Sequence, residues 1–205
     1  MRTGNARTMR RGLGNYVRSG YGGSGTAARR FGGTASAAGA LYRALGGGGA
    51  GAGQAAENAL DAALYAGRDA GEVIDVVRPI DGTQDAEAGC SAVRDALSEL
   101  LTRFPNADLL NLTDEQRAFA IERFVAVDVF QRLTLDLGKA MFEKAPSAAT
   151  ALSRLKQVKD YVKETVAASF RKLRDTGRRL TSSSIGSIVR SALKDTFEVF
   201  EGYAE

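Results

Sequence analysis

The fold class is decided by LTDEQRAFAIERFVAVDVFQRLTLDLGKAMF, residues 112–142. Thr113 and Gln116 form a capping box, and the two acids between them favour the positive end of a helix dipole, so a helix is predicted to begin here. The rest of the stretch is apolar on nearly every side, which is typical of a helix at the centre of a bundle. Its alternations VAVDV and LTLDL also fit short strands, and the sequence leaves that alternative open.

Helical spacing of apolar residues recurs on both sides of this stretch. The predicted helices cover residues 55–66, 70–77, 85–104 and 147–176, and a last one begins at the serines 182–184. Gly177 is well placed to stop the helix that begins at Ser147. We therefore expect an all-α fold, a helical bundle.

The residues on which many enzymes depend are scarce. The chain has no histidine and a single cysteine, Cys90. This excludes a Ser–His–Asp triad, a Cys–His nucleophile, a zinc site of Cys/His type and a disulfide within the chain. We expect no cofactor, no metal and no catalytic residue, and the lack of disulfides favours a reducing, cytoplasmic compartment.

Two acids in the central apolar stretch, Asp128 and Asp136, could suggest metal or acid–base chemistry. Eight residues along a helix separate them by roughly 80° in azimuth, so their carboxylates do not clearly converge. We expect them to pair instead with Arg123, Arg132 or Lys139.

Charge is divided along the chain. Residues 1–56 contain eight arginines, no lysine and no acid, together with sixteen of the 24 glycines, whereas residues 57–128 contain fifteen acids and six bases. Residues 154–179 are basic again, with nine bases and three acids. A basic arm of this kind binds an external polyanion, a protein partner or the acidic part of its own chain.

The first 53 residues are predicted to form a Gly/Arg-rich basic arm, followed by an all-α bundle domain over residues 54–205. Apolar spacing predicts one helix over Arg7–Arg18 and a second that begins at Thr26, its cap, and runs to Leu45. The run GGGGAGAG at 46–53 is typical of a linker. Glycine within a helix costs up to about 1 kcal/mol relative to alanine. Several glycines kept within a helix therefore indicate that another backbone approaches closely. The alternative is that this segment is disordered and of low complexity.

No export signal or membrane span is predicted. No apolar segment follows the basic N-terminus. The longest charge-free runs, residues 31–42 and 44–56, fall short of the roughly 20 residues that a span needs. We expect no membrane partner.

Three stretches together resemble the QatB family of the four-gene Qat anti-phage defence systems of bacteria. They are MRRGLGNYVRSGYGGSGTAARRFGGTASAAGALYRAL (residues 9–45), LTDEQRAFAIERFVAVDVFQRLTLDLGKAMFEKAPSAATALSRLKQVKDYVKETVAASFRKL (112–173) and VFEGYAE (199–205). The resemblance implies a non-catalytic scaffold or substrate subunit that works beside an ATPase (QatA), a QueC-like enzyme of deazaguanine chemistry (QatC) and a TatD-like nuclease (QatD). Family members usually begin with a Gly/Ser/Pro-rich leader on which the QueC-like partner is thought to act. This sequence starts with almost no leader, so no modification residue is assigned.

The arm is predicted to bind the QueC-like partner, with arginines and aromatic anchors around close-packing glycines. The partner-binding residues expected are Arg10, Arg11, Tyr16, Arg18, Tyr21, Arg29, Arg30, Phe31, Gly32, Gly33 and Tyr42. Two alternatives remain: a polyanion-binding protein that uses the basic arm on nucleic acid, and a self-assembling protein joined through Gly32, Gly33 and Gly39.

Overall fold

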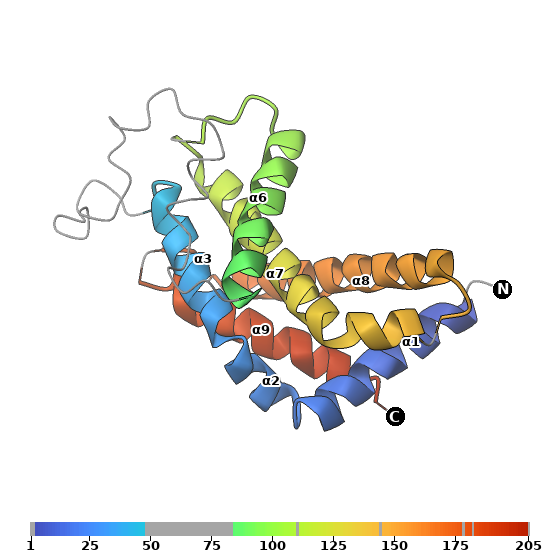
Figure 1. The fold of residues 1–205 in the computed structure, drawn as a ribbon. Helices are drawn as coiled ribbons and strands as arrows, with labels where there is room; N and C mark the ends of the chain where they lie inside the picture. Colours follow the sequence, from blue (N-terminus) through green and yellow to red (C-terminus); the bar gives the residue numbers. More distant parts are fainter. Residues whose placement is uncertain are drawn as a thin grey trace.

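A computed structural model describes residues 3–47, 84–109, 111–143, 145–177, 179–181 and 183–204, and every regular element in these ranges is a helix (Figure 1). The elements are α1 (Thr3–Asn15), the π-helix η1 (Tyr16–Gly20), α2 (Ser24–Arg30), α3 (Gly32–Ala44), α6 (Gln84–Arg103), α7 (Asp114–Glu143), α8 (Ala148–Asp175) and α9 (Ile185–Glu201). The all-α prediction is confirmed. The predicted helices at 55–66 and 70–77, and residues 48–53 of the predicted linker, lie outside the described residues.

The central helix α7 begins where the sequence predicts. Gln116 donates its backbone N–H to the Thr113 hydroxyl at 3.2 Å, and the Thr113 N–H donates to the Gln116 side chain at 2.8 Å. The helix then continues without a break through both alternating segments, so the strand alternative is wrong. It is buried on several sides because α3, α6 and α8 all pack against it, and Ile121, Phe124 and Val125 have no exposed surface.

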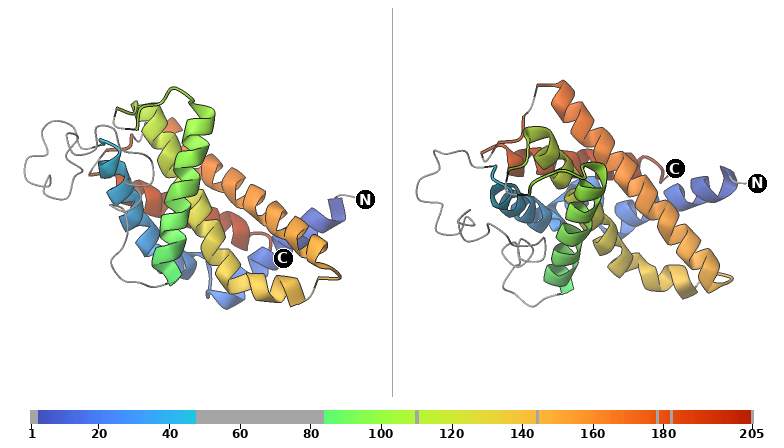
Figure 2. Two further views of the ribbon diagram at one scale, coloured as in Figure 1. Left: turned by 45° about the horizontal axis from the view of Figure 1, so that its top comes forward. Right: turned by 90° about the horizontal axis from the view of Figure 1, so that it is seen from above.

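Helices α6 and α8 lie against α7 (Figure 2). The Ser147 hydroxyl accepts the Thr150 N–H and so starts α8, and Gly177 follows its end with a φ of +77°, as a C-terminal stop requires. Acids of α6 pair with lysines of α8: Lys163 bonds to Glu99, and Lys159 Nζ lies 3.8 Å from Asp95. Two acids of the acidic middle are therefore paired with the chain's own basic helix.

The N-terminal helices pack into the same core as the rest of the described chain. Helices α1, α2 and α3 all contact α9, which runs beside them in the lower half of Figure 1. Helix α3 also contacts α7. One apolar cluster includes Leu13 and Leu41 of these helices together with Phe124 and Phe197. The predicted boundary between residues 53 and 54 lies outside the described residues and stays a prediction.

Two predictions about the N-terminal helices are wrong. The helix expected from Thr26 to Leu45 is interrupted at Phe31, which separates α2 from α3. Thr26 is not the cap of α2, because that helix begins at Ser24 after Gly23, which has a φ of +96°. Among the described residues, no helix has the length and apolar character needed to cross a membrane.

Candidate partner-binding surface

The start of α2 is held by the last helix of the chain. The backbone N–H of Ser24 donates to Glu201 Oε2 at 2.9 Å, so a carboxylate of α9 takes the place that a capping side chain would occupy. The hydrogen bond from Ser24 lowers the pKa of Glu201. A negative charge at this position also suits the positive end of the α2 dipole.

The side chain of Tyr21 is anchored in the bundle. Its hydroxyl donates to Asp136 Oδ2 of α7 at 2.5 Å, and its ring makes edge contacts with Tyr16, Phe31 and Phe197. Burial is the main cause that raises the pKa of Tyr21, and the bond to the Asp136 carboxylate raises it further. Asp136 thus binds a tyrosine of the N-terminal segment and not the basic residues expected from the sequence.

A second polar contact ties α3 to α7. The hydroxyl of Thr34 donates to Asp128 Oδ2 at 2.5 Å, and Arg132 Nε donates to the same oxygen at 3.0 Å. Thr34 has no exposed surface and Asp128 has 1%. The predicted pairing of Asp128 with Arg132 is confirmed.

Close backbone approach occurs at Gly14. A Cβ added there would lie 2.6 Å from the carbonyl oxygen of Phe200 and 2.7 Å from the amide nitrogen of Ala204. At Gly32, by contrast, an added Cβ would meet no atom within 4 Å, and at Gly33 it would lie 3.8 Å from Arg132 Nη2. The close contact that the glycine content indicates is therefore made by Gly14, within the chain's own fold.

Two further predicted site residues also bind inside the fold. The guanidinium carbon of Arg10 lies 4.8 Å from the ring centre of Tyr161 and 5.5 Å from that of Tyr203. The hydroxyl of Tyr42 donates to the Leu180 carbonyl at 2.8 Å. These contacts join α1 and α3 to the C-terminal half of the chain.

Six arginines of the N-terminal helices remain exposed, and we call them the exposed arginine set. They are Arg7, Arg11, Arg18, Arg29, Arg30 and Arg43. Within the described part of the chain, none of them forms an ion pair. Spacings of four and seven residues put Arg7, Arg11 and Arg18 on one face of the α1–η1 segment.

The model of one protein family, described as Qat anti-phage system associated protein QatB, matches residues 22–200. The chain belongs to the QatB family. No significant match is found among curated proteins or solved structures. The region shared with QatB proteins runs from α2 into α9. It includes the Thr34–Asp128 contact and three of the exposed arginines, Arg29, Arg30 and Arg43.

The structure separates the QatB site residues predicted from sequence into two groups. Tyr21, Phe31 and Tyr42 are buried, and Arg10, Tyr16 and Gly32 are half-buried, whereas Arg11, Arg18, Arg29, Arg30 and Gly33 are exposed. A partner of the folded chain therefore meets mainly arginines. Sequence analysis missed Gly14, Thr34 and Glu201, because nothing in their local patterns indicates their distant contacts.

Glu201→Ala tests how this surface is held. Loss of the carboxylate that caps α2 is expected to lower the free energy of unfolding at neutral pH by about 1 kcal/mol, as for other capping side chains. Because the folded-state pKa of Glu201 is lowered, its contribution is present above the unfolded pKa and lost as the pH falls through the folded pKa. Urea unfolding at neutral and acidic pH measures both effects.

Glu198→Ala on the same helix is the matched control. Among the described residues, Glu198 forms an ion pair only with Lys194, one turn away, at 3.7 Å on an exposed face. Its removal is therefore expected to cost about 0.3–0.5 kcal/mol. An equal loss in the two variants, or a Glu201→Ala effect that persists at acidic pH, would contradict the capping role.

Proposed function

We propose that this chain is a non-catalytic subunit of the Qat anti-phage system that binds the QueC-like partner, QatC, through the exposed arginine set. The observation that carries the proposal is that six guanidinium groups are presented without acidic partners among the described residues. Guanidinium forks pair well with carboxylates of another protein. The chain's histidine-free composition agrees with a role without catalysis.

The helices that carry these arginines are held to the bundle by contacts of Tyr21, Ser24 and Thr34 and, for α1, by Arg10 against the rings of Tyr161 and Tyr203. Preorganisation of this kind reduces the entropy lost on binding. The buried aromatic rings support the surface from beneath. The QatA ATPase and the QatD nuclease are further candidate partners within the same system.

Substitution of the six exposed arginines tests the proposal better than deletion, because a deletion of residues 1–50 also removes core residues such as Leu41. We expect the six-fold Arg→Gln variant to lose co-purification with QatC, with an affinity about tenfold lower or worse. The matched control removes the same charge elsewhere. It replaces Lys139, Arg154, Lys156, Arg179, Arg190 and Lys194 with glutamine.

The control is expected to retain QatC, and thermal unfolding followed by circular dichroism verifies that both variants are folded. Undiminished co-purification of the Arg→Gln variant would overturn the proposal. An equal loss in the control would show that net charge, and not this surface, decides binding.

The same six groups suit phosphates, so polyanion binding is the second candidate function. Its signature is affinity for DNA or RNA that falls steeply between about 50 and 200 mM salt. Fluorescence anisotropy with labelled oligonucleotides measures this affinity. Salt-dependent binding that is lost in the Arg→Gln variant, with QatC retained, would favour the polyanion function over the partner function.

A further inference from the structure

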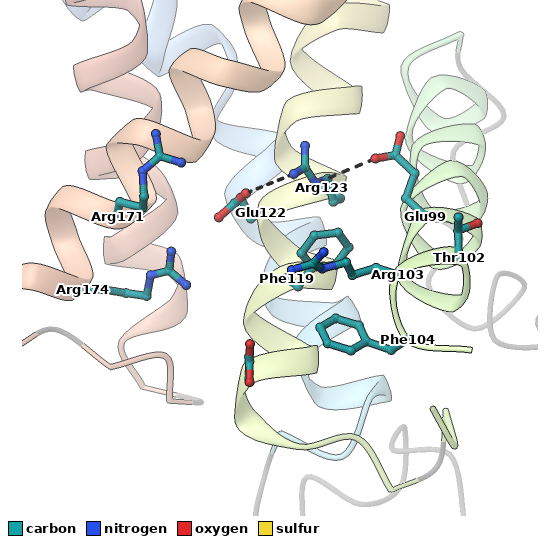
Figure 3. A pocket seen from close by; sticks show the side chains of 10 residues that line it. Glu99, Thr102, Arg103, Phe104, Phe119, Glu122, Arg123, Arg171 and Arg174 are labelled. Carbon is teal, nitrogen blue, oxygen red and sulfur yellow. Dashed lines mark ion pairs between the residues drawn. The ribbon is translucent and has the colours of Figure 1, made fainter. Parts of the chain in front are cut away.

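A cleft of about 590 Å³ is formed between α6, α7 and α8, and no residue of the N-terminal helices lines it (Figure 3). Its volume falls in the range of about 300–1,000 Å³ that is usual for small-molecule sites. Four arginines, three glutamates and two phenylalanines line it. The QatC proposal uses none of these residues.

One wall of the cleft presents two guanidinium groups without acidic partners. Arg171 and Arg174 lie one turn apart on α8, are exposed, and reach towards α7 in Figure 3. Neither forms an ion pair with any residue that the structure describes. Two neighbouring arginines give the forked arrangement of N–H donors that matches phosphate oxygens.

The opposite wall presents a buried acceptor. Glu122 of α7 is 7% exposed, and its nearest cation is Arg123 Nη2 at 3.8 Å, too far for a hydrogen bond. Within the described ranges its carboxylate accepts no hydrogen bond. Burial raises the pKa of Glu122, while the charges of Arg123, Arg174 and Arg171 lower it. Its oxygens are not closed off from solvent, so they are available to an N–H donor of a ligand in the cleft.

The positive charge of Arg123 is shared between two carboxylates, those of Glu122 and Glu99. Its Nε lies 3.8 Å from Glu99 Oε2, and Glu99 is also bonded to Lys163. The same Nε is buried and has no hydrogen-bond partner among the residues that the structure describes. Arg123 Nε is therefore closed to a ligand, and the Glu122 carboxylate is the acceptor that a ligand in the cleft meets.

The third side of the cleft carries two phenylalanine rings. Phe104 and Phe119 meet edge to face, with ring centres 5.6 Å apart, and Arg123 lies 4.9 Å above the Phe119 ring centre. Faces of phenylalanine and guanidinium groups are surfaces on which nucleobases stack.

We propose that this cleft binds a nucleoside phosphate, with the phosphate on Arg171 and Arg174 and an N–H group of the base donating to Glu122. Such a ligand supplies an anion, a donor and a flat ring together. Inorganic phosphate leaves Glu122 without a donor, and an acidic peptide places a second carboxylate beside it. A free amino acid matches both charged walls but leaves the phenylalanine side empty.

Calorimetric titration of the full chain with AMP, GMP, CMP and UMP tests the proposal. At least one nucleotide is expected to bind about tenfold more tightly than its nucleoside and than inorganic phosphate. Arg171→Ala/Arg174→Ala is expected to weaken that nucleotide about tenfold or more, and Glu122→Ala to weaken it without weakening inorganic phosphate. Arg154→Ala/Lys156→Ala, elsewhere on α8, is the control expected to leave binding unchanged.

A 5′-phosphorylated oligonucleotide distinguishes a free nucleotide from the end of a strand as the source of the same chemistry. Strand-end binding is supported if the double arginine variant abolishes it and the six-fold Arg→Gln variant of the exposed set retains it. No binding of any nucleotide, equal binding of nucleotide and inorganic phosphate, or unchanged affinity in the double arginine variant would overturn the proposal. Circular dichroism verifies the fold of each variant.

Discussion

Asp128→Ala is expected to lower the free energy of unfolding by about 3–5 kcal/mol, the range for removing one partner of a buried charged pair. Asp128 is 1% exposed, and its carboxylate accepts bonds from Thr34 of α3 and Arg132 of α7. Alanine leaves a buried hydroxyl and a guanidinium without their acceptor. Because Thr34 belongs to α3, amide exchange over Gly32–Ala44 is expected to accelerate more than exchange over α6.

Urea unfolding of Asp128→Ala and of Asp160→Ala gives the comparison. Asp160 is exposed on α8, so its replacement is expected to change stability by no more than about 0.5 kcal/mol. Asp128→Asn keeps the shape and one acceptor oxygen and is expected to fall between the two. If Asp128→Ala lost no more stability than Asp160→Ala, the contact between α3 and α7 would not stabilise the fold.

Gly14→Ala is expected to lower the free energy of unfolding by about 1–3 kcal/mol, as overpacking of a tight contact does. The added methyl group would lie 2.6 Å from the Phe200 carbonyl oxygen. Both partners at this contact are backbone, so α1 has to move away from the end of α9. The movement also displaces Arg10 from the rings of Tyr161 and Tyr203.

Gly12→Ala on the same helix is the matched control, with the opposite expected sign. An added Cβ at Gly12 meets nothing within 4 Å, so only the helix propensity changes, and alanine is expected to stabilise by up to about 1 kcal/mol. Thermal unfolding of the two variants compares them directly. A stabilised Gly14→Ala variant would show that the close approach of α1 and α9 is not required.

Patterns within a few residues predicted much of the described fold. The capping box at Thr113 and Gln116 located the start of α7 to the residue, and the stop at Gly177 located the end of α8 closely. The spacing of apolar residues, which is also a local pattern, identified α6 and α9. The interruption of the α2–α3 segment at Phe31 was missed, because the small residues on both sides are compatible with one continuous helix.

The candidate surface was predicted only in part. Its arginines were visible from composition, since the first 56 residues contain no acid. The aromatic residues beside them were expected to reach a partner, yet Tyr21, Phe31 and Tyr42 are buried in the chain's own core. Whether these rings are buried depends on the packing of α9 against the N-terminal helices, which no local sequence pattern indicates.

By itself the sequence determined the all-α class, the family, the main helix ends and the division of charge, because caps, apolar spacing and composition act over a few residues. Only the tertiary structure decided which groups meet across the chain. Ser24 and Glu201 are 177 positions apart in the sequence. The separation is 115 positions for Tyr21 and Asp136, and 94 positions for Thr34 and Asp128. The same holds for Glu122 and the arginines of α8. Contacts of this kind exist only once the helices have packed, since packing brings distant side chains within hydrogen-bond reach and excludes water from them.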